Sequence, residues 1–212
     1  MKHDTETVFD KNAIEFATVA VEFCLFLENA PSYSKADFVS KLLKILPLLY
    51  LKISMVETGE AMLDEEIEEF VSENEYELLR NQIAVLLGYS DRYLEVFTRD
   101  MQLSDEALAS DISEDLADIY QDLKNFILRC RLELSEVMND ALVLCVAAFR
   151  DYWGQRLVNC LRALHNVRYG TELEENVDMN KEEFDHQRIK NNLFSQQRDG
   201  DDDALYNALA IV

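Results

Sequence analysis

Three aspartates have types and spacing that could do chemistry. Asp115, Asp118 and Asp122 stand at positions i, i+3 and i+7, so on a helix they form one row of carboxylates about 10 Å long. Like charges stacked in this way repel one another, and we expect a cation to compensate them. Mg²⁺ or Mn²⁺ would suit carboxylate oxygens, and an arginine side chain would also serve.

A second stretch, residues 152–165, supplies a suitable arginine. On a helical wheel Arg156 falls at the edge of the apolar arc that contains Trp153, so its guanidinium is partly buried and needs a carboxylate. We therefore predict that Arg156 faces the aspartate row, or Glu114, across a helix interface. The candidate binding residues are the following: Asp115, Asp118, Asp122, Tyr152, Trp153, Gln155 and Arg156.

Two neighbours of Arg156 are open to a functional or a structural interpretation. Gly154 interrupts an apolar helical pattern directly after the only tryptophan, which indicates close approach of another helix or of a ligand. His165 lies well off the apolar centre of the same helix, and we expect it at the surface.

The composition predicts that helices position these residues. Only 5 Gly and 2 Pro occur among 212 residues, too few turn-formers for a many-stranded sheet. We predict an all-α, antiparallel helical bundle of about five to seven helices in residues 1–170, with a long C-terminal helix. Residues 171–212 are expected to be a mobile acidic tail, and the apolar end 204–212 to dock on its own domain or on a partner.

Local signals place the helices along the chain. Cap residues, apolar periodicity and breakers give the expected elements. They are a buried helix from Asn12 to Asn29, a helix led by Ser34, a short acidic helix over Asp64–Val71, a helix from Ser72 to Gly88, an amphipathic piece over Asp91–Phe97, a helix from Ile112, a turn near Arg131–Ser135 and a helix from Glu136 to Tyr169.

The charge is unevenly distributed. The chain holds 42 acidic and 20 basic residues, a net charge of −22. Residues 57–122 contain 20 acids and 3 bases, a net of −17, whereas residues 123–170 are net basic. Such an acidic face excludes nucleic acid and favours a protein partner with a basic surface. Any anion site would lie along the arginines of the last helix: Arg150, Arg156, Arg162 and Arg168.

The two motif-bearing stretches resemble a known family. A helix reading EDLADIYQDLKNF, paired with one reading YWGQRLVNCLRALH, is similar to a bacterial family of uncharacterised acidic helical proteins, a domain of unknown function. The resemblance covers most of residues 10–170. It implies an all-helical fold and no particular substrate.

A second resemblance concerns metal binding. All-α nucleoside triphosphate pyrophosphohydrolases of the MazG type bind Mg²⁺ through E-x-x-E on one helix and E-x-x-D on the next. Glu66 and Glu69 match the first element, and Asp115 and Asp118 are a variant of the second. The separation of the two elements, the shorter aspartate and the lack of a nearby lysine depart from that family. Under this alternative the chain would be an enzyme with Mg²⁺ or Mn²⁺ as cofactor.

The remaining features favour a non-catalytic protein. The chain shows no glycine-rich phosphate loop, no nucleophile elbow and no cysteine beside a base. The cysteines are scattered among apolar residues, typical of buried free thiols, and no apolar run is long enough to span a membrane. We expect a cytoplasmic adaptor or regulatory module without a cofactor, with a homodimeric structural protein as a further alternative, its seam at the apolar C-terminus or the Trp153 helix.

Overall fold

The structure is a computed structural model of the whole chain, and it describes residues 10–63, 68–94 and 109–170. The predicted all-α bundle is confirmed. Its helices are α1 (Lys11–Glu28), α2 (Lys35–Ser54), α3 (Glu73–Leu87), α4 (Ile112–Cys130), α5 (Ser135–Ala148) and α6 (Gly154–Tyr169). The predictions for Glu66 and for residues 171–212 lie outside the described ranges.

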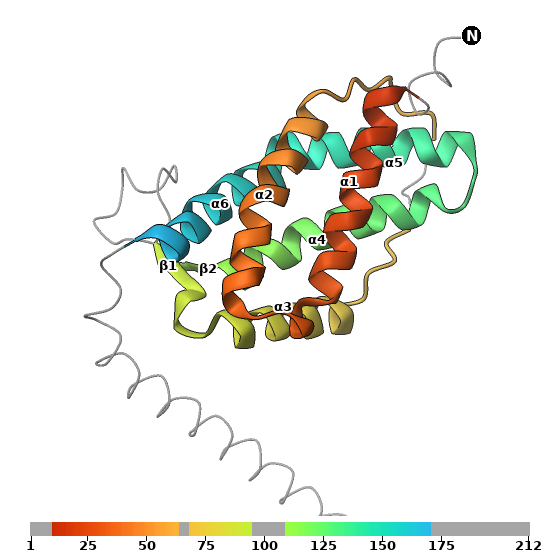
Figure 1. Cartoon of the computed structure of the whole chain (residues 1–212). Coiled ribbons are helices and arrows are strands. Elements are labelled where there is room, and N and C mark those ends of the chain that lie inside the picture. The colour runs from red at the N-terminus through yellow and green to blue at the C-terminus, as the bar shows by residue number, and fades with distance from the viewer. Residues whose placement is uncertain (1–9, 64–67, 95–108, 171–212) are drawn as a thin grey trace, which may run out of the picture. The chain divides into compact units, whose positions relative to one another are not determined.

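The α1 and α2 helices form an antiparallel pair on one side of the bundle (Figure 1). Behind this pair α1 packs on α4, and α2 packs on α6. The α3 helix packs on α4 and on the turn between α1 and α2. The core between these layers is aromatic and aliphatic, and its largest side chain, Trp153, is fully buried.

The starts of α2 and α3 follow the predicted capping signals. Ser72 and Glu75 form a complete capping box at the start of α3. The Ser34 hydroxyl accepts the Asp37 amide at the start of α2. The first helix begins earlier than predicted, because Asp10 and not Asn12 is its cap. It is also not buried all round, since Ile14 and Leu25 are exposed.

Two predicted helical segments are not helical where the structure describes them. Residues 68–71, the described end of the predicted Asp64–Val71 helix, form no helix. In place of the amphipathic piece from Asp91, strand β1 (Arg92–Leu94) pairs antiparallel with β2 (Ala109–Asp111). The Asp91 carboxylate caps the start of α4. It accepts hydrogen bonds from the Ser113 amide at 2.8 Å and from the Ser113 hydroxyl at 2.7 Å.

The last predicted helix is interrupted by a π-helical segment, Phe149–Trp153, between α5 and α6. The Gly154 amide donates to the Phe149 carbonyl five residues earlier, the π pattern. A Cβ on Gly154 would lie 2.4 Å from that oxygen and 2.8 Å from two Phe149 ring carbons. The close approach predicted for Gly154 is therefore made by its own helical turn, not by another helix.

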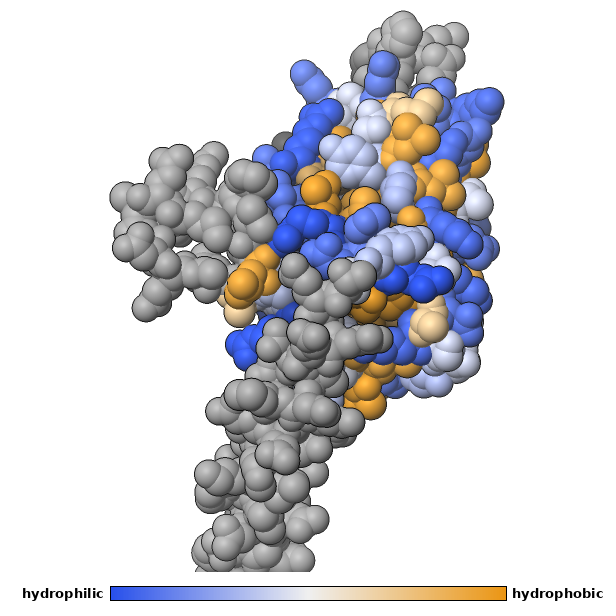
Figure 2. Space-filling view, turned by 60° about the vertical axis from the view of Figure 1, so that its left-hand side comes forward, coloured by the Kyte–Doolittle hydropathy of each residue, from blue (hydrophilic) through white to orange (hydrophobic). Residues whose placement is uncertain are grey.

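None of the helices in the described ranges is long and apolar enough to cross a lipid bilayer. In a space-filling view from the side on which β1 and the end of α6 lie, hydrophobic areas alternate with hydrophilic side chains (Figure 2).

All four cysteines carry free thiols, and three of them are buried. Burial raises the thiol pKa of Cys24, Cys145 and Cys160.

Candidate functional site

The predicted partner of the aspartate row is Arg156. Its Nη1 lies 2.8 Å from the Asp115 carboxylate and its Nε lies 3.0 Å from Asp118. The ion pairs join α6 to α4, as the wheel position of Arg156 predicted. The cation that compensates these two aspartates is therefore an arginine of the same chain.

Three tyrosines complete this cluster, which we call the Asp115 network. Tyr93 on β1 donates its hydroxyl to Asp115. Asp118 accepts the hydroxyl of Tyr76 on α3 at 2.8 Å and that of Tyr152 in the π segment at 2.7 Å. Each of the four carboxylate oxygens thus has a donor within the protein. Arg156 also stacks on the Tyr152 ring, 4.8 Å from its centroid.

Burial sets the electrostatics of the network. It raises the pKa of the Asp115 carboxyl to about 6, while the hydrogen bonds from Tyr93 and Arg156 act in the opposite direction. Burial and the hydrogen bond to Asp118 raise the pKa of Tyr152 to about 12. The pKa of the Tyr76 hydroxyl is raised for the same two reasons. At neutral pH the network therefore combines an ionised Asp115 carboxylate with a guanidinium and neutral phenols.

The third aspartate of the row differs from its neighbours. Asp122 has neither a hydrogen bond nor an ion pair with any described residue. Burial raises the pKa of its carboxyl to about 6, and the charges of Asp118 and Glu69 raise it further while Arg129 lowers it. It is the only member of the row, among described residues, with free acceptor capacity.

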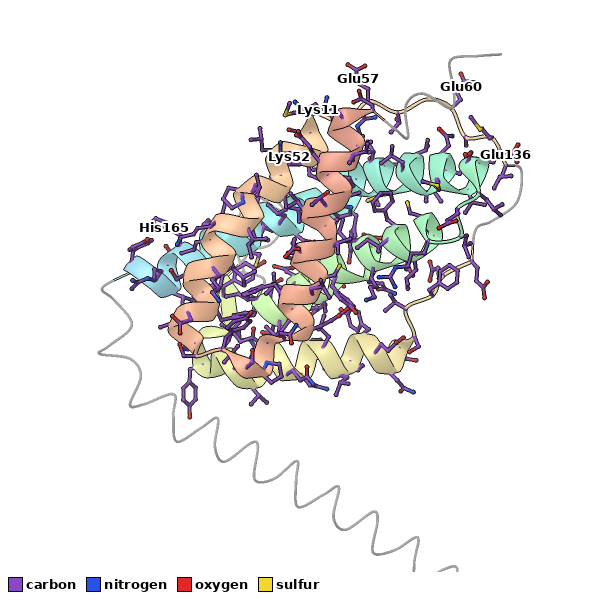
Figure 3. All side chains as sticks on the ribbon, turned by 45° about the vertical axis from the view of Figure 1, so that its right-hand side comes forward. Lys11, Lys52, Glu57, Glu60, Glu136 and His165 are labelled. Atoms are coloured by element: carbon purple, nitrogen blue, oxygen red, sulfur yellow. The ribbon has the colours of Figure 1, made fainter. Side chains whose placement is uncertain are left out.

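The structure separates the other sequence candidates from this network. Trp153 packs on Phe149 with ring centroids 4.8 Å apart, and its indole donates to the Cys145 carbonyl at 3.3 Å. Gln155 is exposed and donates to Asn159 on the next helical turn. His165 is exposed on α6, as predicted, near one end of the bundle (Figure 3).

The described carboxylates of the proposed metal site differ in their burial. Glu69 is exposed on the segment before α3, whereas Asp115 is buried and Asp118 nearly so. A cation would have to displace Arg156 or a tyrosine from either aspartate. Among the residues that the structure describes, no group of three or more His, Cys, Asp and Glu side chains is arranged to hold a metal ion.

The predicted anion site along the last helix is divided by internal contacts. Arg156 is in the Asp115 network, and Arg162 donates to the Leu94 carbonyl at 2.5 Å. Residues six apart on a helix are also about 120° apart around its axis. Arg150, Arg162 and Arg168 therefore form no continuous basic stripe.

Sequence reasoning missed a second polar cluster, which holds the segment before α3 on the bundle. We call residues 57–63 and 68–72 the strap. The Asp140 carboxylate on α5 accepts the amides of Met62 and Leu63, both at 2.7 Å. Asn125 on α4 accepts the amides of Phe70 and Val71 at 2.8 and 3.0 Å. Buried polar residues within apolar helical stripes were the available signal for this cluster.

A groove of about 350 Å³ lies on other elements, between α1, α4 and α5. No charged side chain lines it. The lining residues are Ala13, Ile14, Ala17, Thr18, Val21, Phe126, Cys130, Met138 and Leu142.

Comparison with known proteins identifies the family. A family model described as a domain of unknown function, DUF5063, matches residues 7–170. The chain belongs to the DUF5063 family. A solved structure of the same fold is the crystal structure of protein BF1032 from Bacteroides fragilis, a structural-genomics target. The two sequences are 48% identical, and the structures superpose with a TM-score of 0.70. The match covers 79% of this chain and 99% of the Bacteroides chain. The search of curated proteins found no match.

These comparisons confirm the first resemblance, to an uncharacterised helical family with a bacterial member. The family description gives no reaction.

Proposed function

We propose that this DUF5063 protein is a non-catalytic interaction module that binds a basic protein partner through an acidic surface. The acidic surface comprises glutamates on the strap, α3 and the start of α4, in a region without lysine. Its members are Glu68, Glu69, Glu73, Glu77 and Glu114.

One observation carries the proposal: the carboxylates of this region divide into two groups. Asp115 and Asp118 point inward, where arginine and tyrosine donors occupy their oxygens. The glutamates point outward, and among described residues only Arg80 forms an ion pair with any of their carboxylates, that of Glu77 at 2.7 Å. A catalytic or metal-binding role would call for acceptor oxygens in a cleft, whereas an outward acidic field speeds association with a cationic surface.

The charges of three of these glutamates act on ionisable groups along the α3–α4 contact. The charge of Glu69 raises the pKa of Asp122, and the charge of Glu114 contributes to the raised pKa of Arg80 after the larger effect of Glu77. The acidic surface therefore follows the α3–α4 seam from the strap to the start of α4. A Lys- or Arg-rich partner segment would complement it, and a nucleic-acid backbone would be repelled.

The test is capture of partners by the full chain at about 50 mM and about 500 mM salt, since screening weakens exposed charge pairs. We expect a protein retained at low salt, lost at high salt, and lost at low salt from the triple variant Glu69→Lys, Glu73→Lys and Glu114→Lys. The matched control, Glu22→Lys, Glu136→Lys and Asp151→Lys, has the same net charge with changes at exposed positions elsewhere. Equal retention by both triple variants would overturn the proposal.

The metal-dependent hydrolase remains the alternative, with the free acceptor capacity of Asp122 beside Glu69 as the observation that favours it. Calorimetric titration with Mg²⁺ and Mn²⁺ separates the two functions. Binding abolished by Asp122→Asn would support the hydrolase, and its absence at millimolar metal would remove it.

A further inference from the structure

The second helix carries two apolar faces, and only one of them is used within the chain. Its inner face packs in the core through Leu42, Leu46, Leu49 and Ile53. On the other side Leu48, Leu51 and Met55 are 43%, 52% and 45% exposed. We call these three residues the outer stripe of α2.

The spacing of the outer stripe is that of a helix-packing face. Positions i, i+3 and i+7 lie within about 60° of one another around the axis, at 100° per residue. A solvated helix normally places polar residues there, and contiguous exposed apolar side chains mark interaction sites. The stripe therefore has the form of a surface that packs on another helix.

Charges at the two ends of the stripe are opposite in sign. Lys44 lies one helical turn before Leu48 on the same line, and Lys41 lies one turn earlier; both are exposed. Glu57 and Glu60 follow the end of α2 and are also exposed (Figure 3). Neither Lys44 nor Glu57 forms an ion pair with another described residue.

This arrangement is complementary to itself. If two copies of α2 pack antiparallel about a two-fold axis between Tyr50 and Leu51, the basic side of each stripe, at Lys44, lies toward the acidic end of the other, where Glu57 follows the last turn of the helix. Leu48 then faces the space between Leu51 and Met55 of the second copy, so each apolar side chain meets another.

We propose that the outer stripe of α2 is the interface of a two-fold symmetric dimer of this chain. The face lies on the α1–α2 layer and uses none of the glutamates of the acidic surface (Figure 1). It is a different face from the two seams expected from the sequence, the apolar C-terminus and the Trp153 helix, and Trp153 itself is fully buried. Dimerisation would present two acidic surfaces to one partner and raise its apparent affinity.

Sedimentation velocity on the full chain from about 1 to about 100 μM tests the interface. We expect concentration-dependent dimers, and at least a tenfold rise in the dissociation constant for Leu51→Glu. The matched control is Val85→Glu on α3, where the side chain is 68% exposed, and we expect it to dimerise like the wild type. Far-UV circular dichroism checks that both variants keep their helices.

A charge exchange tests the antiparallel register. Lys44→Glu and Glu57→Lys should each weaken the dimer, because each brings like charges toward one another, and the double variant should restore it. A wild type that stays monomeric over the whole range would overturn the interface. So would a dimer insensitive to Leu51→Glu, or a double variant weaker than both single ones.

Discussion

At the scale of single residues, Asp122 is a carboxyl group whose ionisation opposes folding and which accepts no hydrogen bond from a described residue. The pKa of its carboxyl is about 6 in the folded protein and 3.8 without the surrounding structure. Between these pH values the folded state binds more protons than the unfolded state, so stability falls as pH rises from about 4 to about 6. We expect Asp122→Asn to remove this dependence and to raise the free energy of unfolding at pH 7 by about 1–2 kcal/mol.

Urea unfolding at a series of pH values measures this effect. The difference between variant and wild type should shrink toward zero as the pH approaches 4. Asp151→Asn, an exposed aspartate in the π segment, is the control and should change stability little at any pH. A destabilised Asp122→Asn at pH 7 would mean that a donor reaches this carboxylate in solution.

The residue scale also shows what the sequence could predict of the site. The pairing of Arg156 with Asp115 and Asp118 follows from helical angles, because both partners lie on regular helices. Tyr93 and Tyr76 could not be found in this way. Tyr93 reaches Asp115 from a strand whose position depends on its pairing with β2, and the partner of Tyr76 depends on how α3 packs on α4.

At the scale of elements, the contacts of the strap explain why one predicted helix does not form where the structure describes it. Its local sequence is acidic and helix-compatible, but the amides of residues 70 and 71 donate to Asn125, and the Glu68 carbonyl accepts from Arg129 at 3.0 Å. These side chains stand more than 50 residues later in the chain. Hydrogen bonds to side chains distant in the sequence thus replace the backbone hydrogen bonds of a helix. Helix propensities, which depend on the local sequence, do not predict such contacts.

The π segment was also not predicted from the sequence. Its geometry depends on the glycine at position 154. We expect Gly154→Ala to lower the free energy of unfolding by about 1–3 kcal/mol, because the added Cβ overlaps the Phe149 carbonyl and ring. Thermal unfolding followed at 222 nm measures the loss.

Gly59→Ala is the matched control for Gly154→Ala, since the nearest atom to its added Cβ is Asn139 Oδ1 at 4.0 Å. It should leave stability nearly unchanged. An unaffected Gly154→Ala would show that the helix can adopt a regular α turn there at no cost, and the π segment would then not be required by packing.

At the scale of the whole molecule, the Asp115 network joins elements that lie far apart in the sequence. Its hydrogen bonds connect α3, β1, α4, the π segment and α6. The all-helical architecture itself followed from the low Gly and Pro content and the apolar periodicity. The network fixes how those helices are placed, which periodicity alone leaves open.

The last prediction concerns this cross-link. Arg156→Met keeps most of the side-chain volume but leaves the nearly buried carboxylates of Asp115 and Asp118 without their cation. Removing one partner of a buried ion pair costs about 3–5 kcal/mol, because the remaining charge stays desolvated. We expect a loss of that size in urea unfolding at pH 7, and a smaller loss at pH 5, where protonation of Asp115 relieves part of it. The triple variant Arg156→Met, Asp115→Asn and Asp118→Asn should recover part of the stability, since the amides carry no charge and each keeps one acceptor oxygen for a tyrosine hydroxyl. A triple variant less stable than Arg156→Met would show that geometry, not uncompensated charge, makes Arg156 necessary.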